Sequence, residues 1–297
     1  MARVAVLGST GMLGSTLTRI LERDFASVTE FNRSGRSVTG ANHVETLDVL
    51  DSYDLFEKFN DSKIDYIINA IGMIKQLINE EISEDVLAAH EINSHFMIKL
   101  NEFSAQTGVR VIQIGTDCVY SGMDGSYSEE HFFDPTDTYG KTKNIGEQAS
   151  SESMIIRSSI IGKEKKNSVS LLSWVLSQPE GAKIKGYVNH FWNGVTTLHF
   201  SEIISGIIKS ESFFKGVAHL VPSDAVSKFE LIRIIAREFG RADLEIQEFV
   251  AENRINRTLV TVDPAKNLHM WQEAGYNRAP TIQEMVSKYA SWTKRHG

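Results

Sequence analysis

Short apolar runs alternate along the first half of the chain with stretches in which apolar residues recur every three or four positions. The apolar runs predict strands at residues 3–7, 28–31, 44–47, 65–70, 109–114 and 154–160. The periodic stretches predict helices at residues 12–23, 52–59, 83–106 and about 136–150. Strands that alternate with helices form right-handed βαβ units around a parallel sheet. The predicted fold class is therefore α/β, with a doubly wound parallel sheet of about seven strands.

The pattern loosens after Gly162. Helical periodicity continues at residues 169–176 and 200–208, and residues 218–221 predict a last strand. Two capping boxes, at residues 227–230 and 281–284, each begin a further helix. The second half is therefore expected to contain a smaller, mixed α/β region.

The composition is that of an ordinary globular chain. Its 297 residues include 31 basic and 38 acidic side chains, giving a formal net charge of −7 without any run of Lys and Arg. This balance argues against a nucleic-acid partner. No apolar run reaches the roughly 18 residues of a membrane span, and the first apolar run is too short for a signal peptide. A single cysteine allows no intrachain disulfide, and no His or Cys spacing predicts a metal site. We therefore expect a cytoplasmic protein without membrane or nucleic-acid contacts.

A glycine pattern, G-x-x-G-x-x-G, lies between the first predicted strand and the first predicted helix. Such glycines allow a tight turn, a close approach of the backbone to a pyrophosphate and close packing of helix on strand, while the helix N-terminus supplies free N–H groups. In this position the pattern predicts a Rossmann-type dinucleotide site. Its candidate cofactor contacts are Gly8, Thr10, Gly11, Met12, Leu13 and Gly14.

The dinucleotide pattern also suggests how the chain is divided. We expect residues 1–161 to form the NAD(P)-binding Rossmann domain, completed by about residues 195–221. Residues 162–194 and 222–297 are then expected to form the substrate-binding region.

The end of the second predicted strand bears on the choice of cofactor. Sites that take NAD place an acidic residue there, against the ribose 2′-hydroxyl. This chain has Asn32 and Arg33 instead, while Glu30 lies too early and is expected to point off the strand end. A neutral side chain followed by a guanidinium suits a 2′-phosphate, so NADPH is the expected cofactor and NADH stays an alternative. Further candidate cofactor contacts, at the ends of the next two strands, are Asp48, Val49, Asn69, Ala70 and Ile71.

Tyr139 and Lys143 form a Y-x-x-x-K pattern on a predicted helix. Residues four apart share a helix face, so the ammonium is expected beside the phenol, where a cation lowers the pKa of a tyrosine. Such a phenol is suited to general acid–base catalysis. Thr116 ends the fifth predicted strand, at the sheet edge where ligands bind. The candidate catalytic residues are therefore Thr116, Tyr139 and Lys143.

With these motifs the chain resembles the extended short-chain dehydrogenase/reductase superfamily over its whole length. Within that superfamily it is most similar to the dTDP-4-dehydrorhamnose reductase (RmlD-like) family. The resemblance rests on the glycine loop, Asn69-Ala70, Asn93, Thr116, Tyr139 with Lys143, and the segments at residues 116–122, 157–162 and 226–231.

The resemblance implies NADPH-dependent reduction of the 4-keto group of a 4-keto-6-deoxy sugar linked to a nucleotide diphosphate. Tyr139 then donates a proton to the developing alkoxide, Lys143 holds the cofactor ribose and tunes Tyr139, and Thr116 supports the oxyanion. Asn93 is implied as a further cofactor contact. The implied substrate contacts are Met73, Thr116, Asp117, Cys118, Trp192 and Asn193. Residues 70–76, 160 and 189–196 depart from the family pattern, which leaves the identity of the sugar open.

Two alternatives to the reductase stay open. A nucleotide-sugar epimerase of the same superfamily shares the Y-x-x-x-K pattern, and a non-catalytic NADP-binding regulatory subunit shares the fold. A dehydratase is disfavoured because Asp117 is followed by Cys118, where dehydratases of the superfamily need a glutamate. The expected partner is the nucleotide sugar, and homodimer formation stays open.

Overall fold

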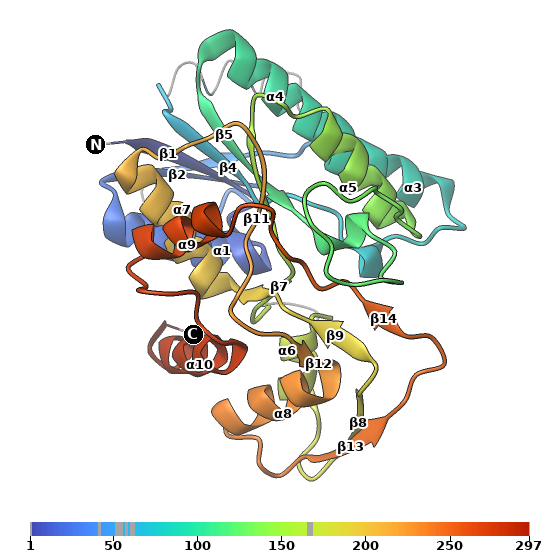
Figure 1. The fold of residues 1–297 in the computed structure, drawn as a ribbon. Helices are drawn as coiled ribbons and strands as arrows, with labels where there is room; N and C mark the ends of the chain where they lie inside the picture. Colours follow the sequence, from blue (N-terminus) through green and yellow to red (C-terminus); the bar gives the residue numbers. More distant parts are fainter. Residues whose placement is uncertain are drawn as a thin grey trace.

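A seven-stranded parallel sheet forms the centre of the protein in a computed structural model that describes residues 2–40, 43–50, 56, 59, 63–164 and 169–296. Its strand order is β11-β6-β5-β4-β1-β2-β3 (Figure 1). The strands are β1 (Arg3–Leu7), β2 (Ser27–Asn32), β3 (Val44–Thr46), β4 (Tyr66–Asn69), β5 (Arg110–Gly115), β6 (Met154–Arg157) and β11 (Gly216–His219). The strand order changes direction between β1 and β4, which is where doubly wound sheets bind ligands. The predicted fold class is confirmed.

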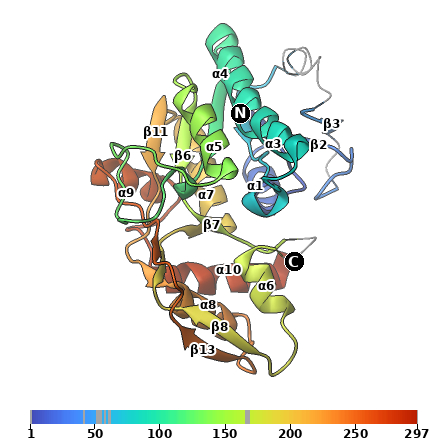
Figure 2. The same ribbon diagram turned by 90° about the vertical axis from the view of Figure 1, so that its right-hand side faces the viewer.

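Helices cover both faces of this sheet (Figures 1 and 2). One face carries α1 (Met12–Asp24), α7 (Thr197–Ser210) and α9 (Pro264–Glu273), and the other carries α3 (Ser83–His90), α4 (Phe96–Thr107) and α5 (Thr138–Gln148). Side chains of β1 alternate between the faces, so Val4 and Val6 enter one apolar core while Ala5 and Leu7 enter the other. Burial on both faces explains why the inner strands β1, β4 and β6 read as nearly continuous apolar runs.

Two predicted elements differ in the structure. The helix predicted at residues 83–106 contains a π-helical turn, η2 (Glu91–His95), between α3 and α4. The strand predicted at residues 154–160 is divided: β6 ends at Arg157, and β7 (Ile160–Ile161) pairs instead with β10 (Val195–Thr196). Both pieces are largely buried, so the apolar run concealed the break. The helix predicted at residues 52–59 lies largely outside the described residues.

A smaller lobe lies beyond the carboxyl ends of the central strands, at the bottom of Figure 1. It contains α6 (Leu171–Ser177), α8 (Lys228–Glu238) and two small sheets. One sheet pairs β8 (Lys183–Tyr187) with β13 (Glu245–Phe249), and the other has the order β12 (Val226–Ser227), β9 (His190–Trp192), β14 (Ile255–Asn256). The two predicted capping boxes are formed, at the starts of α8 and of α10 (Ile282–His296). None of the described helices is long and apolar enough to cross a membrane.

Helix α5 touches the backbone of two neighbouring elements. A Cβ on Gly140 would lie 2.2 Å from the carbonyl oxygen of Cys118, just beyond the end of β5. A Cβ on Gly146 would lie 2.5 Å from the carbonyl oxygen of Asn93, in the π-helical turn. These glycines therefore let the helix approach both elements more closely than a larger residue allows.

We expect Gly146→Ala to lower the free energy of unfolding by about 1–3 kcal/mol, because the added methyl group forces the two helices apart. Urea unfolding followed by circular dichroism measures the loss. Gln148→Ala, on an exposed position of the same helix, is the matched control and should change stability by less than about 0.5 kcal/mol. An unchanged urea midpoint for Gly146→Ala would contradict the tight approach.

Candidate active site

The glycine loop between β1 and α1 forms a cradle of bare backbone. Gly8 has φ +80°, a conformation that favours glycine, and a Cβ on Gly14 would lie 2.0 Å from the Gly8 carbonyl oxygen. No side chain caps α1 at Gly11, so N–H groups of its first turn stay available. Bare backbone beside an open helix N-terminus suits a pyrophosphate. The loop therefore fits the dinucleotide that its sequence predicts.

The other predicted contacts of this loop differ in exposure. Thr10 is exposed and Met12 is half-buried, whereas Leu13 is buried in the core beneath the sheet. Met12 Cγ lies 3.1 Å from the place where Gly162 would carry a Cβ, so the chain leaving β7 passes beside the start of α1. Thr10 and Met12 are thus open to a ligand, while the side chain of Leu13 serves packing.

The loop that follows β4 lies against the glycine loop. A Cβ on Gly8 would lie 3.0 Å from Ile71 Cγ1 and 3.1 Å from the carbonyl of Ala70. Asn69 accepts a hydrogen bond from the Ile71 backbone nitrogen at 3.1 Å and donates to Gln113 Oε1 at 2.8 Å. The Asn69 amide therefore fixes the loop, and Ala70 and Ile71 are the residues that it brings beside Gly8.

Asn32, at the end of β2, is buried and holds two loops together. Its amide nitrogen donates to Ser9 Oγ at 2.9 Å and to the Arg36 carbonyl at 3.1 Å, and its oxygen accepts from the Ser34 backbone and hydroxyl groups. Arg33 and Arg36 are exposed, and within the described residues neither guanidinium forms an ion pair. The guanidinium of Arg33 is therefore available to an anion, whereas the Asn32 side chain is engaged.

The expectation that Glu30 points off the strand end is wrong. Glu30 is completely buried, and its carboxylate accepts hydrogen bonds from the Ser37 hydroxyl and, at 3.1 Å, from the Val38 backbone nitrogen. Strand β2 pairs on both sides, so its alternate side chains face the two covered faces of the sheet. Through these hydrogen bonds the Glu30 carboxylate holds residues 37 and 38 against β2.

Two further predicted cofactor contacts follow β3. Asp48 is half-buried and accepts a hydrogen bond from the Leu50 backbone nitrogen at 3.1 Å. Val49 is buried in the apolar core that also contains Leu7 and Phe31. The side chain of Val49 is thus a core side chain, while Asp48 shapes the turn.

The π-helical turn places Asn93 between the loop after β4 and helix α5. The Asn93 amide accepts from the Met73 backbone nitrogen and donates to the Met73 carbonyl, both at 2.9 Å. It also donates to Thr142 Oγ1 at 3.2 Å, while Ser94 Oγ donates to the Thr142 carbonyl at 2.7 Å. Asn93 is almost completely buried, so its amide acts as a positioning group for Met73 and α5 rather than as an open contact.

The three predicted catalytic residues converge at the carboxyl end of β5. Thr116 directly follows β5, and its side chain opposes part of the burial-driven rise in the pKa of the Tyr139 phenol. Tyr139 lies in the first turn of α5, which is capped by Asp137 through the Gly140 backbone nitrogen at 2.8 Å. One turn later, Lys143 is buried, and its ammonium donates to the Ile114 carbonyl at 2.7 Å.

The electrostatics of this trio differ from the expectation that Lys143 lowers the pKa of Tyr139. Burial raises the pKa of the Tyr139 phenol well above its usual range. Burial also lowers the pKa of Lys143, while the charge of Glu147 opposes that shift. The Lys143 ammonium is directed to the Ile114 carbonyl at the end of β5. Tyr139 is thus a proton donor held in its neutral form.

Two cations from the smaller lobe, Lys228 and Arg257, face this edge, although no sequence motif predicted a role for either. Burial lowers the pKa of Lys228 to about 8, and the charge of Asp117 opposes the shift. The Lys228 ammonium lies 5.7 Å from the Trp192 ring centre. Arg257 donates to the Tyr120 carbonyl at 2.8 Å, and its charge together with that of Lys228 opposes a burial-driven rise in the pKa of Asp117. The capping box that begins α8 could have indicated Lys228, because it fixes that residue at the start of the helix.

Two further predicted substrate contacts, Trp192 and Asn193, have polar groups that are engaged within the protein. Trp192 is buried and donates from Nε1 to Ser159 Oγ at 2.8 Å. Asn193 uses both ends of its amide on the Leu259 backbone, at 2.7 and 2.9 Å, and so fixes the segment that follows Arg257. Asn193 is therefore a positioning residue in the smaller lobe.

A cavity of about 510 Å³ in the smaller lobe includes Lys228 in its wall. Its lining comes from α6, β8, α8 and the residue His190: Leu171, Trp174, Gln178, Lys183, Ile184, Lys185, Tyr187, His190, Lys228 and Ile232. Lys228 relates this cavity to the end of β5, because the Lys228 charge also acts on Asp117. Aromatic and cationic side chains line it together.

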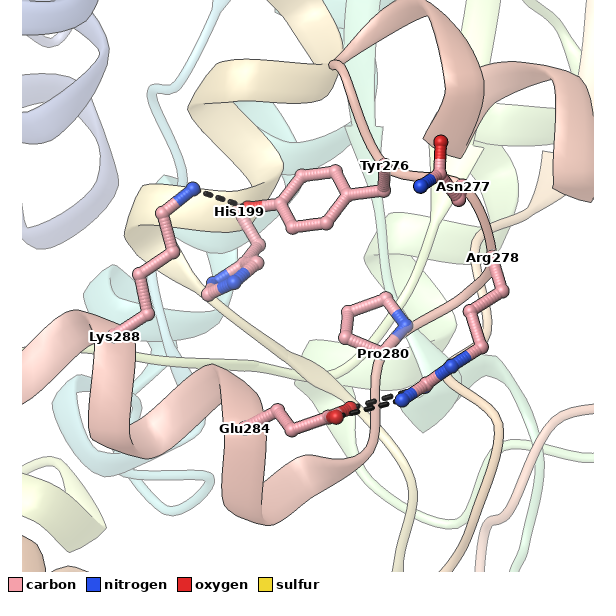
Figure 3. A pocket seen from close by; sticks show the side chains of 7 residues that line it. All are labelled: His199, Tyr276, Asn277, Arg278, Pro280, Glu284 and Lys288. Atoms are coloured by element: carbon pink, nitrogen blue, oxygen red, sulfur yellow. Dashed lines mark hydrogen bonds and ion pairs between the residues drawn. The ribbon is translucent and has the colours of Figure 1, made fainter.

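A second hollow, of about 290 Å³, lies elsewhere, among α7, α10 and the segment between α9 and α10 (Figure 3). Its charged side chains are paired: Arg278 with Glu284 at 2.6 Å, and Lys288 with Glu202 at 2.8 Å. The Lys288 ammonium also contacts the Tyr276 hydroxyl at 2.7 Å. None of its lining residues belongs to the catalytic trio or to the glycine loop.

Comparison with known proteins assigns the chain to a family. The sequence model of the RmlD substrate binding domain matches residues 2–259. The chain belongs to this family. It is 30% identical over 148 residues to a dTDP-4-dehydrorhamnose reductase of Streptomyces griseus, an alignment that covers 50% of this chain and 44% of that protein. It is 23% identical over 255 residues to methionine adenosyltransferase 2 subunit beta of Rattus norvegicus, covering 80% of this chain and 72% of that protein.

A solved structure supports the fold. The dTDP-4-dehydrorhamnose reductase of Bacillus anthracis, in complex with NADP, has a TM-score of 0.77 at 19% identity and covers 97% of this chain and 99% of that one. The predicted resemblance to the RmlD-like family is thus confirmed. The relative from Streptomyces griseus and the solved structure from Bacillus anthracis are both dTDP-4-dehydrorhamnose reductases, and the latter is in complex with NADP.

The site makes a prediction for its only cysteine. Burial, together with the charge of Asp117, raises the pKa of the Cys118 thiol to about 12. At pH 8 its thiolate fraction should therefore be about a thousandfold lower than in the unfolded chain. We expect alkylation by iodoacetamide, followed by mass spectrometry, to be at least about a hundredfold slower in the native protein than in urea. Equal rates would contradict the raised pKa of the Cys118 thiol.

Proposed function

We propose that the protein uses NADPH to reduce the 4-keto group of a 4-keto-6-deoxy sugar linked to a nucleotide diphosphate. The observation that carries this proposal is the convergence of Thr116, Tyr139 and Lys143 at the end of β5, opposite Lys228 and Arg257 of the smaller lobe. The trio supplies acid–base groups for a carbonyl, and the two cations supply charge for an anionic substrate.

The cofactor, when bound, supplies the hydride that reduces the carbonyl carbon. Bare backbone at Gly8 and Gly14 accepts its pyrophosphate at the open end of α1. Arg33 meets the 2′-phosphate with a charge-assisted contact. Ala70 and Ile71, beside Gly8, flank the nicotinamide ribose.

The chain's own residues handle the proton and the oxyanion. Tyr139, neutral at physiological pH, donates its phenolic proton to the carbonyl oxygen as negative charge develops there. The Thr116 hydroxyl donates a hydrogen bond to the same oxyanion. The hydroxyl groups of Thr116 and Tyr139 are both in position before the reaction begins. Lys143 turns from the Ile114 carbonyl to the cofactor ribose and supports the phenolate that Tyr139 leaves behind.

The smaller lobe recognises the nucleotide part of the substrate. Lys228 and Arg257 neutralise the diphosphate, and Asp117 keeps their charges oriented. The cavity lined by Trp174 and Tyr187 accepts the nucleoside, since rings and cations together suit a base and its phosphates. On this basis we assign residues 162–194 and 222–297 to the substrate-binding region, apart from α9, which packs against α7 and β11. Residues 1–161 with about 195–221 form the cofactor domain.

Two other functions fit the same frame. An epimerase would use Tyr139 and Lys143 with a tightly held cofactor, which would co-purify with the protein. A regulatory subunit is favoured by the similarity to methionine adenosyltransferase 2 subunit beta. The presence of Thr116, Tyr139 and Lys143 together favours the reductase over the regulatory subunit.

We propose the cytoplasm, where nucleotide sugars are used, as the location of the protein.

Replacing the proposed proton donor tests the reductase chemistry. We expect Tyr139→Phe to lower kcat by about 10²–10⁴-fold while leaving NADPH affinity nearly intact, because only the general acid is lost. NADPH oxidation with a panel of nucleotide-linked 4-keto-6-deoxy sugars measures turnover.

Tyr66→Phe is the matched control, since it removes a phenol at the amino end of β4, away from the site. It should turn over like the wild type. Wild-type turnover in Tyr139→Phe would contradict the assigned acid.

The choice of cofactor is tested at Arg33. Arg33→Ala should weaken NADPH binding by about tenfold and leave NADH binding unchanged, because a charge-assisted hydrogen bond to phosphate contributes about 1.5 kcal/mol or more. Fluorescence titration at low salt measures both dissociation constants, and the preference should shrink with added salt.

Arg295→Ala, on the exposed last turn of α10, controls for the change in net charge. Asn32→Asp does not test a reversal of the cofactor preference cleanly, because it also removes the donor to Ser9 and to the Arg36 carbonyl. Equal wild-type affinities for the two cofactors would mean that Arg33 is only a surface charge.

A further inference from the structure

A buried ion pair lies directly behind the catalytic trio. Glu147 and Arg157 have side chains that are each 1% exposed, and Arg157 Nη2 and Nε donate to Glu147 Oε2 at 2.6 and 3.0 Å. Glu147 follows Lys143 by one turn of α5, and Arg157 is the last residue of β6. The chemistry assigned above uses neither residue.

The free oxygen of this carboxylate reaches a catalytic residue. Glu147 Oε1 accepts a hydrogen bond from the Thr116 backbone nitrogen at 3.1 Å. The carboxylate therefore joins the start of the Thr116 segment to α5, the helix that carries Tyr139 and Lys143. A shift of Glu147 moves the hydroxyl of Thr116 relative to the phenol.

The guanidinium extends the connection toward the smaller lobe. Arg157 Nη1 contacts Tyr120 Oη at 3.0 Å and His219 Nε2 at 2.8 Å, and His219 Nδ1 contacts the Val260 carbonyl at 2.7 Å. Because Nδ1 faces a carbonyl acceptor, it carries the proton, and Nε2 accepts from Arg157. The chain of contacts ends three residues beyond Arg257.

Glu129 stabilises the contact between His219 and the segment that includes Val260 and Thr261. Its carboxylate accepts from the His219 backbone nitrogen at 2.8 Å and from Thr261 Oγ1 at 2.8 Å. Burial lowers the pKa of His219 to about 4, and the charge of Arg157 adds to the shift. The imidazole is therefore neutral at physiological pH, and the contacts persist through that range.

A buried ion pair is weak as a device for stability, because apolar residues of the same size often stabilise a core as well. The hydrogen bonds of this pair instead connect Thr116, at the end of β5, with the segment of the chain that carries Arg257. We propose that Glu147, clamped by Arg157, is a positioning residue for the reductase reaction: it fixes Thr116 against α5 and sets a negative charge one helical turn from Lys143. This inference rests on the proposed function for its substrate.

The groups that face Lys143 come from four elements: Met97 on α4, Ile114 at the end of β5, Glu147 on α5 and Arg157 on β6. Of the two charged groups among them, Glu147 favours the charged ammonium, whereas Arg157, like burial, disfavours it. Loss of the carboxylate therefore lowers the pKa of Lys143. Because turnover requires the charged Lys143 ammonium, its decrease at alkaline pH should begin at a lower pH than in the wild type.

Glu147→Gln tests the charge while preserving the shape and the acceptor for Thr116. We expect kcat to fall by about tenfold at pH 7, and the alkaline limb of its pH profile to move down by about one pH unit. The melting temperature should also fall, since Arg157 is left buried and unpaired.

A second variant separates positioning from folding. Glu147→Leu combined with Arg157→Met leaves no unpaired charge, so the melting temperature should recover toward the wild type. The loss of kcat should remain, because Thr116 still lacks the carboxylate. The alkaline limb should stay below that of the wild type but shift less than in Glu147→Gln, because the charge of Arg157, which lowers the pKa of Lys143, is also removed. Recovery of wild-type kcat and of the pH profile together with stability would overturn the proposal.

Two further variants complete the comparison. Arg157→Lys keeps a cation against Glu147 and the contact with Thr116, so kcat should stay within about threefold of the wild type, with an unshifted alkaline limb. A shifted limb in this variant would contradict the role of the carboxylate. Asp24→Asn removes a carboxylate that binds Arg23, Ser205 and Lys209 on the far side of the sheet, and should lower stability without changing the kinetics.

Titration of NADPH binding across pH distinguishes failure of this proposal from failure of the proposed function. If the wild type reduces no nucleotide sugar, the proposed function fails. The affinity of Glu147→Gln for NADPH should still begin to fall about one pH unit earlier than that of the wild type, since Lys143 is the proposed partner of the cofactor ribose. Identical pH dependence of NADPH binding in the two proteins would overturn the positioning role on its own.

Discussion

The close approach of helix α5 to the end of β5 is the constraint on which the site depends. Gly140 and Gly146 bring the helix against the carbonyls of Cys118 and Asn93, where a Cβ would collide. The same helix carries Tyr139, Lys143 and Glu147, so its position decides where the phenol, the ammonium and the buried carboxylate lie. The π-helical turn takes part, because it presents the Asn93 carbonyl to Gly146 and the Asn93 amide to Thr142.

Burial gives the polar groups of this region their chemical character. In surroundings of low polarity an unpartnered charge is costly, so each charge is held by a partner or shifted in pKa. Tyr139 stays neutral, Arg157 is paired with Glu147, and Lys228 lies within reach of the charge of Asp117. The proposed acid, the proposed anion site and the positioning carboxylate follow from the same physical rule.

The sequence was sufficient for the central sheet because its strands are buried on both faces and separated by periodic helices. It was also sufficient for the glycine loop and the trio, whose residues lie at strand ends and on one helix face. The smaller lobe was harder, because β9, β12 and β14 are two or three residues long and leave no periodic pattern. Lys228 and Arg257 acquire their place only when that lobe folds over the sheet edge.

Other errors had local physical causes. The buried orientation of Glu30 depends on the return of the chain at Ser37 and Val38, which strand alternation alone does not reveal. The π-helical turn is concealed because its residues continue the apolar period of α3 and α4. Asn32, Asn69 and Asn93 lie at predicted site positions, yet each amide is engaged by protein groups. Residue type indicated where the candidate site lies. Only the hydrogen-bond partners in the structure distinguish side chains that are available to a ligand from those that hold the site in place.

The most direct test of the central claim is the fate of the transferred hydride. The protein is incubated with NADPH deuterated at the nicotinamide C4 position and a nucleotide-linked 4-keto-6-deoxy sugar, and the product is analysed by mass spectrometry and NMR. The account predicts that one deuterium appears on sugar C4 in the product, together with stoichiometric oxidation of the cofactor. A product with deuterium at no sugar carbon, or an epimer formed without net oxidation of NADPH, would contradict it.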